Sequence, residues 1–298
     1  MVHLTSEIKN DKIFFLIITD DKNNQIFYNK NIYFTDKKNE LKDFTLLVNS
    51  KNIQVILLDL LKYKKNYIKT IKEKFNIKIV SFHENKDYSC YSDLLVNCNL
   101  DVEKKSLKKH YNLISGSKYI IFNEKIKKYL SVKKKNQIFI YFGGSDPSDF
   151  TSIFINNLVN NLKQENFLIH IGNFKSREFQ KKKAFKNIKF FNDGKKILQN
   201  LSQSKLAIVS AGNIMYESIF LNIKTIVVAH NNHQDIFAKI AKKYNLVQYY
   251  GTDKKVYLKS IYDFISTSEI KKQIKKNHII DGNGNNRIMK RISKLIGK

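Results

Sequence analysis

Three short segments contain residues whose types and spacing are suited to ligand binding or catalysis. The first is Gly143-Gly-Ser-Asp-Pro147. It follows an apolar run typical of a strand and precedes a segment of helical periodicity. Adjacent glycines there let backbone N–H groups approach a phosphate or a pyrimidine ring, and the helix N-terminus favours negative charge. An ordinary tight turn, with Ser148 or Asp149 capping the helix, accounts for the same residues.

The second segment is Ser210-Ala-Gly-Asn-Ile-Met-Tyr-Glu217, again between an apolar run and a helical pattern. Its small residues expose backbone N–H groups. Glu217 is predicted on the first turn of the helix, where the dipole favours a carboxylate and where ribose hydroxyls can donate to it. In the alternative interpretation Glu217 caps the helix start at Asn213, or Asn213 is itself the N-cap.

The third segment is Ala229-His-Asn-Asn-His-Gln-Asp235. Asn232, His233 and Gln234 are neutral hydrogen-bonding groups at a predicted helix N-terminus, and they suit sugar hydroxyls or a diphosphate better than proton abstraction. His230 and His233 are spaced for a possible metal site, but no Asp, Glu or Cys of convincing spacing joins them. We therefore expect neither a metal nor a cofactor.

The elements that position these segments alternate short apolar runs with amphipathic stretches, which predicts an α/β fold with mostly parallel sheets. The expected strands are 13–18, 32–35, 55–60, 77–82, 94–97, 138–142, 167–171, 188–191, 206–210, 225–229 and 246–250. The expected helices are 41–48, 67–75, 150–162, 197–201, 213–221, 234–243, 257–264, 270–276 and 287–296. A charged run, 131–136, is the expected linker. Three strand-to-helix turns at one edge of one sheet should converge on one crevice.

Length and composition limit the class of protein. The chain has 298 residues and a formal net charge of +28, and 42% of its residues are hydrophobic, which excludes a disordered basic tail. Only three of its 54 basic residues are Arg, a composition that fits a solvated Lys-rich surface better than a specific nucleic-acid reader. Weak association with anionic membranes stays open. The two Cys provide no disulfide framework, and without an apolar leader we expect a cytoplasmic location.

Together with the closing motif Asp281-Gly-x-Gly-x-x-Arg287, the three segments resemble the UDP-sugar hydrolases of pseudaminic-acid biosynthesis, which are related to family 28 glycosyltransferases. The resemblance implies a GT-B-like architecture of two Rossmann-like lobes. It also implies that Glu217 holds the ribose, that the turns at Gly144 and Gly212 hold the uracil and diphosphate, and that Asn232 and Gln234 face the sugar. The full expected substrate-binding set is Gly143, Gly144, Ser145, Asp146, Ala211, Gly212, Asn213, Glu217, Asn232, His233 and Gln234.

The implied lobes are residues 1–130, without the family's first strand and helix, and residues 137–298, the nucleotide-sugar lobe. The family's Gly-x-Gly-His turn, which carries the base that activates water, is absent. His3 and Asp59 are the nearest candidates, and neither has the family's context, so the catalytic residue stays unassigned. The expected function is hydrolysis of a UDP-linked amino sugar in surface-sugar biosynthesis, with a family 28 type glycosyltransferase or a catalytically inactive UDP-sugar-binding protein as alternatives.

Glycine and proline are scarce, with ten Gly and one Pro in the chain. Several of them fall in the first two turns and in the closing motif. We therefore expect that the backbone needs them there and that most of these places belong to one nucleotide pocket.

Overall fold

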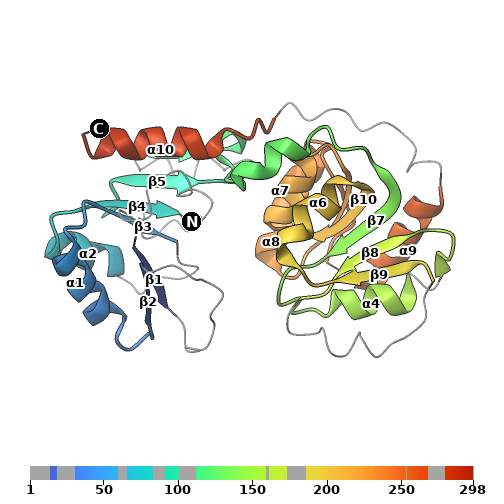
Figure 1. The fold of residues 1–298 in the computed structure, drawn as a ribbon, viewed down its shortest axis with the longest axis horizontal. Coiled ribbons are helices and arrows are strands. Elements are labelled where there is room, and N and C mark those ends of the chain that lie inside the picture. Colours follow the sequence, from blue (N-terminus) through green and yellow to red (C-terminus); the bar gives the residue numbers. More distant parts are fainter. Residues whose placement is uncertain are drawn as a thin grey trace. The chain divides into compact units, whose positions relative to one another are not determined.

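The computed structural model describes residues 14–18, 31–59, 66–82, 91–100, 112–158, 161–172, 186–252, 254–267 and 279–297. The chain forms two compact units (Figure 1). The first comprises Met1–Cys98, Val102–Ile121 and Asn283–Lys298, and the second comprises Asn99–Asp101 and Phe122–Gly282. This division differs from the expected lobes, because the end of the chain groups with the first unit and the second unit begins at Phe122. His3 and the expected helix 270–276 lie outside the described residues.

The first unit contains a four-stranded parallel sheet of order β3-β4-β5-β6. Its strands are β3 (Val55–Leu58), β4 (Lys78–Phe82), β5 (Leu94–Asn97) and β6 (Leu113–Ser115), of which β6 was not predicted from the sequence. Two further strands, β1 (Phe15–Ile18) and β2 (Ile32–Thr35), pair in parallel as a separate sheet.

Helices cover both faces of the four-stranded sheet. On one face α1 (Glu40–Lys51) and α2 (Tyr67–Lys74) enclose an apolar cluster that includes Ile79 of β4. On the other face α10 (Gly284–Leu295) packs Ile288 and Ile292 against a cluster that includes Val80 (Figure 1). Consecutive residues of β4 thus face opposite sides, as the period of a strand requires.

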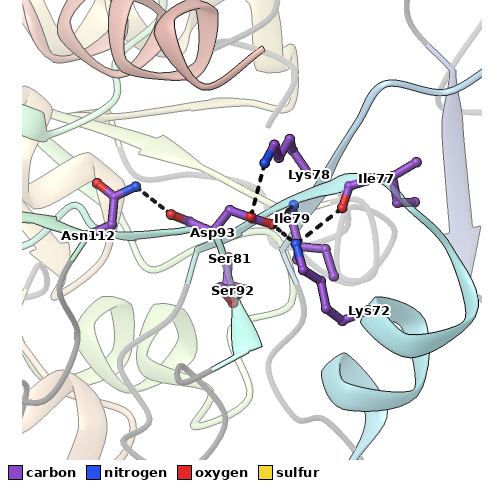
Figure 2. Close-up of polar contacts among 8 residues, drawn as sticks. All are labelled: Lys72, Ile77, Lys78, Ile79, Ser81, Ser92, Asp93 and Asn112. Atoms are coloured by element: carbon purple, nitrogen blue, oxygen red, sulfur yellow. Dashed lines mark hydrogen bonds and ion pairs between the residues drawn. The ribbon is translucent and has the colours of Figure 1, made fainter. Parts of the chain in front are cut away.

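A polar cluster surrounds Asp93, directly before β5 (Figure 2). Its carboxylate accepts hydrogen bonds from Lys72 Nζ at 2.5 Å and from the N–H of Ile79 at 2.9 Å, and Lys78 Nζ lies 3.6 Å away. The side chain of Asn112 donates to the Asp93 carbonyl. Burial works to raise the pKa of Asp93, but these hydrogen bonds and the two ammonium charges together lower it. The cluster therefore joins α2, β4 and the start of β5.

The second unit is built on a six-stranded parallel sheet of order β12-β11-β10-β7-β8-β9. The strands are β7 (Lys135–Tyr141), β8 (Phe167–His170), β9 (Ile188–Phe191), β10 (Ser204–Ser210), β11 (Lys224–Val228) and β12 (Gln248–Tyr249). From β7 the chain adds β8 and β9 on one side and then β10, β11 and β12 on the other. The strand order therefore reverses between β7 and β10, and ligands of doubly wound sheets bind beside such a point.

The helices of this unit are α4 (Phe150–Asn157), α6 (Ile197–Ser202), α7 (Asn213–Phe220), α8 (Asn232–Lys243) and α9 (Lys254–Ser266), with short 3-10 turns η4 (Glu124–Tyr129) and η6 (Gly194–Lys196). A third such turn, η3 (Ser117–Tyr119), belongs to the first unit. The α/β class with mostly parallel sheets is confirmed. No helix among the described residues is both long and apolar enough to span a bilayer.

Several expected boundaries differ from the observed ones, notably those of α4 and β7. α4 ends at Asn157 instead of Leu162, and β7 begins at Lys135, inside the expected linker 131–136. The lysine-rich sequence predicts a solvated connection, but the N–H of Lys135 donates to the Gln203 carbonyl at 2.6 Å. Pairing with β10 thus extends the strand into a segment whose own composition does not favour it.

Candidate functional site

The three turns follow three neighbouring strands. β10 pairs in parallel with β7 on one side and with β11 on the other. The turns after Tyr141, Ser210 and Val228 therefore lie at the same edge of the sheet, and the first two flank the point where the strand order reverses. The expectation that the three turns meet at one edge is confirmed.

The turn after β7 has two geometric constraints, one at Gly143 and one at the Gly144 carbonyl. Gly143 has φ +95°, which L side chains rarely adopt, and Gly144 and Ser145 are exposed. The backbone of Gly172, which follows β8, lies so close to the Gly144 carbonyl that no Cβ would fit. The turn is thus held against the end of the neighbouring strand, and Gly144 and Ser145 stay exposed.

Asp146 has a different role from the one expected. Its buried carboxylate accepts hydrogen bonds from the N–H groups of Phe150 at 3.0 Å and Thr151 at 2.8 Å, so it caps α4. The expected caps were Ser148 and Asp149, but Asp149 makes no side-chain cap bond and adopts a left-handed conformation, φ 52°. The N-terminus of α4 is therefore already occupied by a carboxylate of the protein itself.

The turn after β10 leaves its helix open. Gly212 occupies the N-cap position of α7, and no side chain of the described residues bonds to the first-turn N–H groups of this helix. The expected caps, Asn213 or a Glu217 contact to it, do not form, and Asn213 is exposed. Within the part of the chain that the structure describes, these N–H groups thus have no side-chain acceptor, and a helix start of this kind can bind an anion.

Glu217 is the fifth residue of α7, so it lies one turn further along the helix than expected. Glu217 is partly exposed as a residue, and its carboxyl group, although mostly surrounded by protein, has no hydrogen-bond or ion-pair partner within the described part of the chain. Burial raises the pKa of Glu217 to about 7. Tyr141, the last residue of β7, interacts with the Glu217 charge. Burial in the first place, and this negative charge in the second, raise the pKa of the Tyr141 hydroxyl.

His170, at the end of β8, was not among the expected site residues. Its ring packs edge-on against Tyr141 and Phe191, with centroid distances of 4.7 and 4.8 Å. Burial lowers the pKa of His170, against smaller opposing effects of Asn192 and Asp193, so its imidazole is neutral near pH 7. A histidine at the carboxyl end of a parallel strand was the sequence signal that could have identified this residue.

The turn after β11 is stabilised by its own side chains. Asn231 caps α8 by accepting from the N–H of Gln234 at 3.0 Å, and Gln234 Oε1 accepts from the N–H of His230 at 2.9 Å. The carbonyl of the Gln234 side chain is therefore engaged, and its amide NH₂ is the part suited to a ligand. Asn232 and His233 are exposed on the first turn of α8, with the His233 ring 4.6 Å from that of Phe237.

The closing motif makes close packing contacts. A Cβ on Gly282 would clash with the Phe220 ring, and a Cβ on Gly284 would overlap the backbone of Ile120. Arg287 donates to the Lys118 carbonyl at 2.9 Å. The glycines of this motif thus allow close backbone approach, and their place in a nucleotide pocket stays a prediction. No cluster of three potential metal ligands occurs among the residues that the structure describes.

No protein-family model matches the chain. It is 29% identical over 223 residues to an uncharacterized protein of Methanocaldococcus jannaschii, a match that covers 66% of this chain and 46% of that protein. It is 27% identical over 207 residues to the spore coat polysaccharide biosynthesis protein SpsG of Bacillus subtilis, covering 64% of this chain and 60% of SpsG. The match thus spans about half to three fifths of the length of these curated relatives.

Solved structures confirm the fold. MurG of Acinetobacter baumannii matches with a TM-score of 0.68 at 12% identity, covering 98% of this chain and 94% of MurG. The Staphylococcus aureus MnaA–UDP structure matches with a TM-score of 0.62 at 13% identity, covering 91% and 83%. The chain therefore has a GT-B-like fold.

Proposed function

We propose that the chain binds a UDP-linked sugar at the edge formed by the turns after β7, β10 and β11, and that it acts in surface-polysaccharide biosynthesis. Similarity to SpsG, whose name assigns it to spore coat polysaccharide biosynthesis, supports the process. Two of the structural neighbours were solved with such ligands, MnaA with UDP and a UDP-GlcNAc 2-epimerase with UDP-GlcNAc. We further propose that the sugar is an amino sugar and that the reaction is hydrolysis.

The unpartnered carboxyl of Glu217 carries the proposal. A carboxyl group that has lost most of its surrounding water and has no protein partner lacks hydrogen bonds, and hydroxyl groups of a ligand would supply them. The 2′ and 3′ hydroxyls of a ribose can do so whether the carboxyl is ionised or protonated, since a protonated carboxyl both donates and accepts. The Glu217 carboxyl lies one turn into α7, so a ribose bound to it lies close to the open N-terminus of that helix.

The same geometry supports a proposed place for the diphosphate. Of the three helices that begin at this edge, α4 is capped by Asp146 and α8 by Asn231, whereas α7 has no side-chain cap among the described residues. A second anion beside the Asp146 carboxylate would be repelled, so the glycine turn after β7 suits an uncharged part of the ligand, the base or the sugar. The diphosphate is therefore assigned to the N-terminus of α7.

In the proposed reaction water attacks the anomeric carbon, the bond from that carbon to the diphosphate oxygen breaks, and UDP leaves. The N–H groups of α7 would stabilise the charge that develops on the departing diphosphate. The group that takes the proton from water stays unassigned. Asp59 is exposed after β3, and His3 is outside the described residues.

Two measurements test the proposal. Isothermal calorimetry with UDP should show saturable binding that Glu217→Gln weakens about tenfold, the loss expected for one charged hydrogen bond. Glu165→Gln is the matched control, because Glu165 pairs with Lys205 at 2.6 Å and precedes β8 at the opposite edge of the sheet. Incubation with UDP-N-acetylated amino sugars should then release free UDP. Absence of UDP binding by the wild-type chain contradicts the proposed site.

Glycosyl transfer is the second candidate, supported by a structural neighbour that is named as a sugar transferase, the spinosyn rhamnosyltransferase SpnG. The two reactions differ in their need for an acceptor. UDP release in buffer alone supports hydrolysis, whereas release only after addition of a sugar or lipid acceptor supports transfer. UDP binding without release under either condition identifies a binding protein that does not catalyse the reaction.

A further inference from the structure

His230 joins two of the three turns. It follows β11, yet its ring nitrogen Nε2 lies 2.9 Å from the carbonyl oxygen of Phe142, which follows β7. Because β10 lies between β7 and β11 in the sheet, this contact passes across the end of the intervening strand. A carbonyl can only accept, so Nε2 carries the hydrogen and donates it.

The ring is fixed on its other sides as well. It stacks on Phe150, the first residue of α4, with a centroid distance of 4.8 Å, and its side chain is 4% exposed. Nε2 lies 3.9 Å from Oδ1 of Asp146, the carboxylate that caps α4. The imidazole is therefore in contact with the start, the middle and the end of the turn that contains Gly143 and Gly144.

The backbone of His230 is tied to the third turn. Its N–H donates to Gln234, and the N–H of Gln234 donates to Asn231. A displacement of the His230 ring would therefore move the first turn of α8 relative to the turn after β7. These two turns lie on either side of the turn after β10, the proposed place of the diphosphate and ribose.

A metal-binding role for His230 does not fit this geometry. Nε2 is engaged with the Phe142 carbonyl, and Nδ1 is buried, with no hydrogen-bond partner in the described part of the chain. A buried nitrogen enclosed on all sides is not open to an exposed ion, and His233 is exposed with its ring against Phe237.

We propose that His230 is a positioning residue that sets the spacing between the turn after β7 and the N-terminus of α8, and thereby holds the proposed nucleotide-sugar site open at a fixed width. This inference rests on the proposed function. It predicts that loss of the Nε2–H donor or of the ring stacking weakens ligand binding, although His230 itself does not touch the ligand.

The test compares two substitutions by calorimetry with UDP at a temperature well below unfolding. His230→Phe keeps a ring against Phe150 but loses the donor, and it should weaken UDP binding about tenfold, the equivalent of one buried hydrogen bond. His230→Gln places an amide N–H near the position of Nε2 and should restore binding to within about threefold of the wild type. Ile226→Val is the control for a loss of stability without a change at the turns. It removes one methyl group from a fully buried side chain within β11.

A second measurement does not depend on any ligand. In ¹⁵N-resolved NMR spectra of the free chain, His230 should be the Nε2–H tautomer with a slowly exchanging proton.

If the wild type binds UDP and His230→Phe binds equally well, the positioning role is wrong while the proposed function stands. If the wild type does not bind UDP, the proposed function fails, and the tautomer then reports whether the contact between the turns exists. An Nδ1–H tautomer would overturn the inference directly.

Discussion

The backbone of Gly172 lies directly against the carbonyl oxygen of Gly144, and the two residues follow neighbouring parallel strands, β8 and β7. The contact leaves no room for a Cβ on Gly172, although the backbone conformation there is one that other residues adopt. It fixes the turn after β7 from the side opposite to His230. The first turn of the site is therefore held between two contacts made by different strands.

Gly172→Ala should destabilise the chain by about 2 kcal/mol, because the added methyl group must displace backbone rather than a flexible side chain. Urea unfolding monitored by circular dichroism measures the change in the free energy of unfolding. Gly194→Ala is the control, since nothing lies within 4 Å of a Cβ at that position. Equal stability of the two variants would show that the contact is not this close in solution.

Glu217→Gln should stabilise the ligand-free chain at high pH. The folded pKa of about 7 lies above the ordinary value of 4.5, so ionisation in the folded state costs stability as the pH rises from 4.5 to 7, and the cost is constant above 7. The difference in unfolding free energy between variant and wild type should grow to about 3 kcal/mol at most at pH 8, from near zero at pH 4.5. Asp263→Asn, an exposed residue of α9, should show no such trend.

Asp93→Asn should destabilise the first unit by about 2 kcal/mol at pH 7, because it weakens hydrogen bonds from an ammonium group and a backbone N–H (Figure 2). The folded pKa of Asp93 is lowered, so its stabilisation is present above the ordinary value of 3.8 and is lost as the pH falls through the folded pKa. Unfolding curves of wild type and variant should therefore converge at acid pH, below that folded pKa. Glu73→Gln, in an exposed ion pair with Lys69, should change stability little at either pH.

Gly284→Ala distinguishes packing from helix propensity by the sign of its effect. Ala in place of Gly favours a helix by about 1 kcal/mol, so propensity alone predicts stabilisation of α10. The backbone of Ile120 occupies the position of the new methyl group, which predicts destabilisation and loss of α10 packing on its sheet. Hydrogen exchange of the α10 amides should accelerate in the variant, and slower exchange would contradict the packing argument.

Local patterns were sufficient to predict most of the second unit. The alternation of apolar runs identified the strands that carry the three turns, since a parallel strand covered on both faces is apolar almost throughout. The run Leu206–Ser210 is an example, because every one of its residues is buried in β10. Such a run predicts a central strand without any knowledge of its neighbours.

Side-chain roles at the turns were harder to predict. Asp146, Ser148 and Asp149 are all good N-caps by type. The backbone of the turn, with positive φ at both Asp146 and Asp149, brings the Asp146 carboxylate to the N–H groups of α4. His230 was considered only as a metal ligand, because its partner Phe142 is 88 residues away in the chain. The packing of α10 on the first unit also depends on contacts that no local pattern contains.

The three turns at the sheet edge contain no lysine or arginine, in a chain whose formal net charge is +28. Surface lysines attract every anion alike, whereas the open N-terminus of α7 offers oriented dipoles to one group at one place. In the proposed function, encounter with the nucleotide and its retention would thus depend on different parts of the molecule. Added salt should slow association while leaving the residence time of the bound nucleotide nearly unchanged, which makes the Lys-rich surface a kinetic feature and the turns the source of selectivity.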